Sequence, residues 1–106
     1  KPQRVWHHLA LPNVELLGLA AVVRPGVTAD GAEFTCYSLV MQPAVAQIEA
    51  VHDRMPVLIP PGFAEEWLMS SSPAGELIDA AAAASKTLSE RVVASPQGAS
   101  GTAPLF

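Results

Sequence analysis

The sequence predicts an α+β fold with a mostly antiparallel, barrel-like sheet and short flanking helices. Two short apolar runs, residues 14–23 and 34–41, are separated by a loop rich in turn-forming residues, as in a β-hairpin. Short helical patterns bounded by prolines follow, and residues 74–85 form an alanine-rich segment of high helix propensity. From the residues alone, it stays open whether these elements form a complete domain or part of one.

The two apolar runs are predicted to be antiparallel neighbours. Residues 14–23 are rich in Val, Leu and Ala, and Gly18 within them opposes a helix. Residues 24–32 contain one proline, two glycines and an aspartate, which favour turns. Because both runs are apolar at successive positions, we expect the hairpin to be buried on both faces.

A helix and a strand are predicted on either side of Pro56. Pro43 suits the first turn of a helix, which we expect to continue over residues 44–51. Pro56 ends this helix, because the residue before a proline is pushed into an extended conformation. Residues 57–59 are then expected to form a short strand.

Two more helices and one strand complete the prediction. We expect a helix at residues 63–69, with Trp67 as its core anchor, and another at residues 74–85. The stripe that the second helix should bury consists of Leu77, Ile78 and Ala81. A last strand is expected within residues 88–95. Residues 97–106 are expected to form a flexible tail.

Composition narrows the classes of protein. The chain has 106 residues, of which 50% are hydrophobic, enough for one modest core. The net charge of −4 disfavours a nucleic-acid binder, since such proteins usually carry a basic patch. No apolar run reaches the ~18 residues of a membrane span. A single cysteine cannot form an internal disulfide, so we expect a reducing, cytoplasmic compartment.

The most informative segment is His52-Asp53-Arg54, where three ionisable side chains follow one another in a chain poor in charge. If the preceding helix extends to His52, the imidazole lies on the face of Ile48 and points inward, at a helix C-terminus that favours its protonated form. Such a histidine suits general acid–base catalysis. Arg54 suits a phosphate or carboxylate, and Asp53 can orient either neighbour. The alternative is a surface loop with a capping histidine and an Asp53–Arg54 ion pair.

Other polar residues favour structural roles. Cys36 lies in an apolar strand, which indicates a buried, inert thiol. The adjacent His7 and His8 would point apart in a strand, so we expect no metal site there. Glu65 and Glu66 fit an exposed helix surface. No phosphate-binding glycine loop, nucleophile elbow or metal-binding pair is present, and no cofactor is expected.

The sequence VHDRMPVLI at residues 51–59 resembles the C-terminal signature of the SOS response-associated peptidase (SRAP) domain. Upstream, FTCYS at residues 34–38 is similar to a strand of that family, and FAEEWL at residues 63–68 resembles its helix after the signature. The resemblance covers residues 1–96 and corresponds to the second half of a typical SRAP domain.

The resemblance implies a sensor of abasic sites in single-stranded DNA. In the family, a cysteine at the mature N-terminus, exposed by autocatalytic removal of the initiator methionine, forms a thiazolidine crosslink with the ring-opened sugar. By resemblance, His52 assists proton transfers and Arg54 contacts a DNA phosphate. Asp53 supports this pair, and Ser38 stands where the family commonly has a threonine.

The chain also departs from the family pattern. It begins with Lys1, and the family's N-terminal cysteine, asparagine and glutamate motifs would lie upstream of it. Cys36 cannot replace the nucleophile, because it lacks the free α-amine that a thiazolidine requires. Two alternatives therefore stay open: a truncated or degenerate SRAP-like module that binds without catalysis, and an unrelated small α+β domain.

Overall fold

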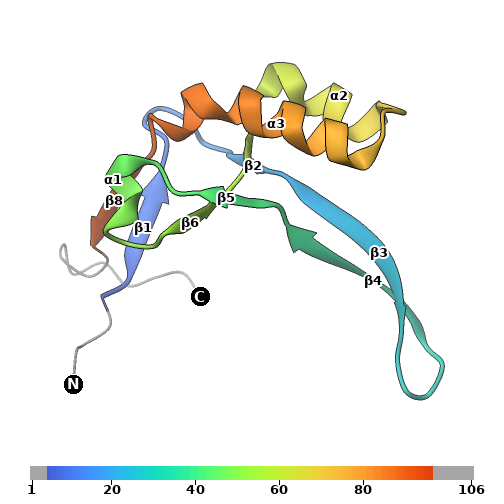
Figure 1. The fold of residues 1–106 in the computed structure, drawn as a ribbon. Coiled ribbons are helices and arrows are strands. Elements are labelled where there is room, and N and C mark those ends of the chain that lie inside the picture. The colour runs from blue at the N-terminus through green and yellow to red at the C-terminus, as the bar shows by residue number, and fades with distance from the viewer. Residues whose placement is uncertain (1–4, 97–106) are drawn as a thin grey trace.

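The structure, a computed structural model, describes residues 5–96 and confirms the α+β class (Figure 1). Within these residues the strands pair as four separate two-stranded antiparallel sheets. The pairs are β1 (His7–Ala10) with β8 (Val93–Pro96), β2 (Gly18–Leu19) with β7 (Leu58–Ile59), β3 (Ala21–Val27) with β4 (Glu33–Leu39), and β5 (Met41–Pro43) with β6 (Arg54–Pro56). The barrel-like sheet is not found there, because a barrel closes only when every strand pairs along both edges.

The predicted hairpin is confirmed as β3 and β4, with Val23 opposite Tyr37. Its strands reach further than expected, so the turn is confined to residues 28–32. Gly31 there has a φ of 89°, which glycine adopts without strain. The Thr28 hydroxyl donates to the Asp30 carboxylate, and this hydrogen bond lowers the pKa of that carboxyl below its usual value.

The expected burial of the hairpin on both faces is wrong. The side chains of Val23, Val27 and Tyr37 are 69%, 65% and 70% exposed. The hairpin projects from the body of the molecule (Figure 1), and no described element covers these three residues. The apolar residues on both faces of the hairpin were the basis for predicting its burial. Burial also requires a helix or strand packed against each face, and residues 5–96 do not provide these.

The helices differ from their predicted bounds. α1 (Ala46–Glu49) is a single turn, and α2 (Ala64–Met69) follows the 3₁₀ turn η1 (Pro61–Phe63). α3 (Ala74–Ser89) is four residues longer than expected and takes in two residues assigned to the last strand, which begins only at Val93 as β8. The predicted tail, residues 97–106, lies outside the described residues.

Two buried apolar clusters form the core. The first surrounds Ile48 and contains Leu11, Ala44, Met55, Leu58 and Val92. The second contains Ala20, Val57, Ile59 and Ala81, and Trp67 packs against it, as expected of an anchor. Of the predicted stripe on α3, Ala81 is fully buried, whereas Leu77 and Ile78 are half-buried.

A buried polar network joins α3 to the strands beneath it. Ser85 and Ser89 are fully buried, and their hydroxyls lie 2.8 Å apart. The Ser85 hydroxyl accepts the backbone N–H of Leu58 at 2.8 Å, and the Gln42 side-chain amide reaches both hydroxyls at 3.3 and 3.1 Å. Both buried hydroxyls therefore have hydrogen-bond partners, as buried polar groups should.

The described fold is open. Its radius of gyration is 16.6 Å, whereas a compact domain of this length has about 13 Å. Within residues 5–96, no helix has both the length and the apolarity needed to cross a bilayer.

We predict that Ser85→Ala lowers the free energy of unfolding by about 1–3 kcal/mol, because it leaves the Leu58 N–H buried without a partner. The higher helix propensity of alanine offsets up to ~0.5 kcal/mol of this. Urea unfolding measures the loss. The control, Ser71→Ala, changes an exposed serine and should be close to neutral. Equal effects of the two substitutions would contradict the role of the network.

Candidate functional site

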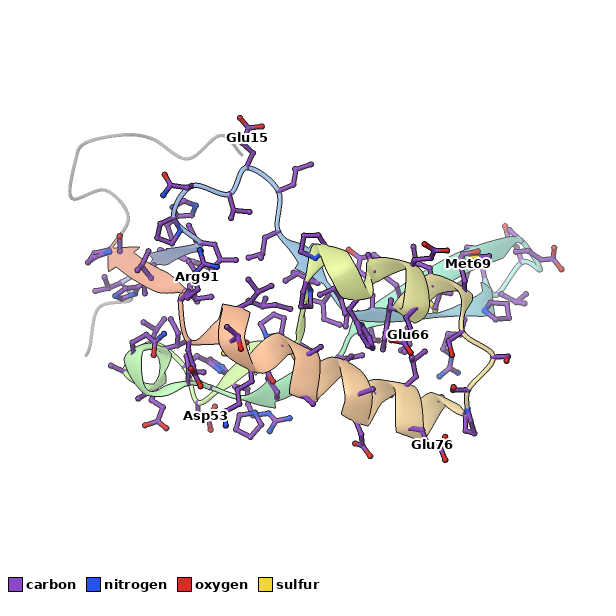
Figure 2. The ribbon with its side chains drawn as sticks, turned by 90° about the horizontal axis from the view of Figure 1, so that it is seen from above. Glu15, Asp53, Glu66, Met69, Glu76 and Arg91 are labelled. Carbon is purple, nitrogen blue, oxygen red and sulfur yellow. The ribbon has the colours of Figure 1, made fainter. Side chains whose placement is uncertain are left out.

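The His-Asp-Arg loop, defined as His52, Asp53 and Arg54, connects α1 to β6. Buried residues hold it on both sides, since Ile48 in α1 and Met55 in β6 belong to the same core cluster. The Ala44 N–H donates to the Asp53 carbonyl at 3.0 Å and closes the base of the loop. The three side chains are therefore presented from a fixed backbone at one end of the molecule. Figure 2 shows Asp53 at this end, far from Glu76 at the start of α3.

The orientation expected of His52 is wrong. α1 ends at Glu49, with Ala50 as its C-cap, so His52 lies beyond the helix, although its N–H still donates to the Ile48 carbonyl at 3.0 Å. The His52 side chain is 66% exposed and faces solvent instead of the interior. The helical extension fails because Pro56 and the pairing of β6 with β5 require extended backbone from Arg54 onward.

The Nδ1 atom of His52 lies between a donor and two acceptors. It is 3.0 Å from the Arg54 N–H nitrogen, 3.1 Å from the Arg54 carbonyl oxygen and 3.4 Å from an Asp53 carboxylate oxygen. A neutral ring accepts the Arg54 N–H at Nδ1 and carries its proton on Nε2. A proton on Nδ1 would break this hydrogen bond, because two N–H donors would then face each other at 3.0 Å. The loop therefore holds the ring through Nδ1 as an acceptor and leaves Nε2 without a hydrogen-bond partner among the described residues.

Arg54 extends from the first residue of β6 into solvent. The ion pair that the sequence offered between Asp53 and Arg54 is not found: Asp53 pairs with His52 instead, at 3.4 Å. Within residues 5–96 no carboxylate lies within ion-pairing distance of the Arg54 guanidinium. Its charge is thus available to a ligand.

Ser38 is not brought to this loop. It is exposed in β4 and lies opposite Val22 in the hairpin. Arg54 pairs instead with Pro43. Pro43 lies five positions after Ser38, a separation of up to ~16 Å along an extended strand. No hydrogen bond within the described residues links Ser38 to the His-Asp-Arg loop.

The remaining polar candidates are spread over the fold. Cys36 is a free, half-buried thiol whose Sγ donates to the Arg24 carbonyl at 3.4 Å, so its predicted full burial is wrong. Glu65 and Glu66 are exposed on α2, as predicted. His7 and His8 lie in β1. Within residues 5–96 no cluster of three potential metal ligands occurs.

Sequence reasoning missed Gln47, which fixes α1. Its Nε2 atom lies 3.3, 2.8 and 3.2 Å from the carbonyl oxygens of Ser89, Glu90 and Val92, where α3 ends and the chain turns into β8. The carbonyls at the end of a helix lack the usual partner in the next turn, and the two Nε2 hydrogens of Gln47 are shared among these three oxygens. The available signal was a glutamine next to Ile48 in an otherwise apolar and charged segment, which is too weak to interpret alone.

Comparison with known proteins identifies the family. The family model for the SOS response associated peptidase (SRAP) matches residues 1–96 of the 106. The chain belongs to the SRAP family. This excludes the unrelated small domain that the sequence had left open, and it confirms the resemblance drawn from the His-Asp-Arg loop and its flanks.

A solved structure has the same fold. The crystal structure of a protein from Bacteroides thetaiotaomicron superposes with a TM-score of 0.67 at 14% sequence identity, over 94% of this chain. The match covers only 44% of the Bacteroides chain, so this SRAP chain spans less than half of its structural neighbour. No curated protein matches the chain.

We predict that His52→Ala changes the free energy of unfolding by less than about 1 kcal/mol, because it removes one exposed hydrogen bond from the Arg54 N–H. Thermal unfolding followed by circular dichroism measures the change. Ile48→Ala serves as the contrasting control, because it empties a buried site and should cost about 2–5 kcal/mol. A His52→Ala loss in the range of the Ile48→Ala loss would assign His52 a folding role.

Proposed function

We propose that this SRAP chain presents His52 and Arg54 to single-stranded DNA at an abasic site, as part of an SOS-associated DNA-damage module. The observation that carries the proposal is the geometry of the His-Asp-Arg loop. A histidine whose Nδ1 accepts the Arg54 N–H, and whose Nε2 has no hydrogen-bond partner among the described residues, stands beside an arginine that no described carboxylate neutralises. This arrangement suits proton transfer next to a phosphate better than it suits a structural cap.

The proposed chemistry is the condensation of a cysteine with the aldehyde of an abasic site. The amine adds to the aldehyde carbon, one water leaves, and the thiol sulfur then bonds to the same carbon. Loss of water requires a proton on the departing oxygen, and addition of the thiol releases one. His52 would supply the first and accept the second through Nε2, the ring nitrogen that the loop leaves toward solvent.

The nucleophile in this proposal comes from SRAP sequence outside the present chain. Cys36 cannot serve, since thiazolidine formation needs an amine and a thiol on the same residue. The half-buried Cys36 also lies on the hairpin, separate from the His-Asp-Arg loop. Its single free thiol fits the reducing cytoplasm that we propose as the compartment.

Arg54 would position the DNA strand. A guanidinium carries its charge at any physiological pH and matches the geometry of phosphate oxygens. The chain has an acidic net charge of −4, so each cation free of a carboxylate matters more for holding a polyanion. We propose that Asp53 orients His52 through their contact at 3.4 Å. Ser38 has no proposed contact with the reacting atoms.

We predict that His52→Ala slows crosslinking to an abasic single-stranded oligonucleotide by roughly 10²–10⁴-fold, the usual contribution of a general acid or base. The protein is used at its natural length, and covalent product is followed on denaturing gels. Noncovalent binding to the same strand without the lesion should stay within about twofold, because His52 contacts no phosphate in this proposal.

The control for this experiment is His8→Ala, which removes an exposed histidine from β1. It should leave the rate unchanged. A parallel loss of crosslinking and of noncovalent binding in His52→Ala would contradict the proton-transfer role. Crosslinking that depends on Cys36 would contradict the proposed source of the nucleophile.

We predict that Arg54→Ala weakens binding to intact single strands of any base sequence and flattens the plot of log affinity against log salt by about 0.7, the value for one phosphate contact. Fluorescence anisotropy across a salt series measures this slope. Arg24→Ala, which removes an exposed arginine from β3, is the matched control and should preserve the slope. An unchanged slope with a lower melting temperature would remove Arg54 from the DNA interface and favour the alternative of a noncatalytic structural module.

A further inference from the structure

One face of the β3–β4 hairpin is apolar and open. Side chains alternate between the two faces of a strand pair, so Val23, Val27, Tyr37 and Leu39 lie on the same face. We call this set the open face. Its members are 69%, 65%, 70% and 40% exposed. The same register places the polar residues Thr35 and Glu33 on this face, toward the tip of the hairpin. Exposed apolar side chains gathered on one face are typical of an interaction site.

The opposite face of the hairpin is partly covered by its own residues. Phe34 lies opposite Gly26, and its ring occupies the space above that glycine, so that a Cβ at Gly26 would lie 2.4 Å from a ring carbon. Phe34 and Val22 on that face are 47% and 44% exposed, close to the 40% of Leu39 on the open face. The two faces differ in Val23, Val27 and Tyr37, which are 65–70% exposed.

The Bacteroides structure offers an occupant for the open face, because more than half of that chain lies outside the matched region. A second copy of the present chain is the alternative occupant, and the experiment below separates the two.

We propose that the open face is the surface against which the remaining part of a SRAP domain packs. The occupant is a polypeptide segment of SRAP-family sequence from outside Lys1–Phe106 of this chain, joined to it or separate. Apolar contacts with Val23, Val27 and Tyr37 would hold it, and the free edges of β3 and β4 would give it backbone hydrogen bonds. This inference rests on family membership and the fold, and not on the proposed DNA chemistry.

The test is photo-crosslinking in living cells of the organism that naturally produces the protein. Tyr37 is replaced by p-benzoylphenylalanine, an aromatic residue of similar shape that bonds covalently to neighbouring C–H groups under ultraviolet light. Crosslinked peptides are identified by mass spectrometry. We expect the attached peptides to match SRAP-family sequence outside Lys1–Phe106. The same probe at Glu65, exposed on α2, is the control and should give at least tenfold less of this product.

Variants on the same face sharpen the result. Val23→Lys places a charge beside position 37 and should reduce the crosslink at least tenfold, whereas Val23→Leu keeps an apolar side chain and should retain it. Arg24→Glu changes the charge on the opposite face and should also retain it. Three outcomes would each overturn the proposal. The first is crosslinked peptides from a second copy of Lys1–Phe106, and the second is a crosslink yield at position 37 equal to that at position 65. The third is an equal crosslink yield from Val23→Lys and Val23→Leu.

Discussion

The position of the His-Asp-Arg loop depends on two serine hydroxyls buried under α3. Through Ser85 the helix binds the backbone of β7, and through Gln42 it binds β5. β5 in turn pairs with β6, whose first residue is Arg54. Gln47 adds a second attachment between α1 and the end of α3. The His-Asp-Arg loop has three exposed side chains, but its position is set by Ser85 and Ser89, which are fully buried.

This dependence explains why a short helix suffices beside the site. A four-residue helix such as α1 is not stable by itself in water, because the free-energy cost of nucleating a helix exceeds the gain from the hydrogen bonds of one turn. Ile48 in the core and Gln47 on the carbonyls of α3 supply what the isolated turn lacks. The loop geometry is therefore a property of the tertiary structure and not of the local sequence.

The sequence predicted those features that prolines, β-rich runs and a motif define locally. The short strand expected after Pro56 is found as β7, the turn-rich residues before Glu33 marked a hairpin, and the His-Asp-Arg motif with its flanks identified the family. The consecutive order of His52, Asp53 and Arg54 made their proximity certain. What lies near them in space, such as Gln47, depends on packing between segments about forty residues apart and leaves no local signal.

The errors have a common physical origin. The inward orientation of His52 assumed one more turn of helix, and each added residue rotates a side chain by about 100°. Burial of the hairpin assumed that apolar residues always have a partner within the same stretch of chain, which Val23 and Tyr37 contradict. The barrel-like sheet likewise needed strand partners that residues 5–96 do not provide. Periodicity identifies a surface that prefers burial, but it does not say which polypeptide buries it.

The separation of the His-Asp-Arg loop from the open face has a thermodynamic consequence. The loop lies at the α1 end of the molecule, and the hairpin extends to the opposite end (Figure 1). Two ligands influence one another only through a coupling free energy, carried by an element whose state both of them bias. The two places are still joined by backbone, because β4 of the hairpin continues through Val40 into β5, which pairs with β6 at Arg54. Any influence of a polypeptide on Val23 and Tyr37 over a strand of DNA at Arg54 would therefore have to pass along this β4–β5 connection.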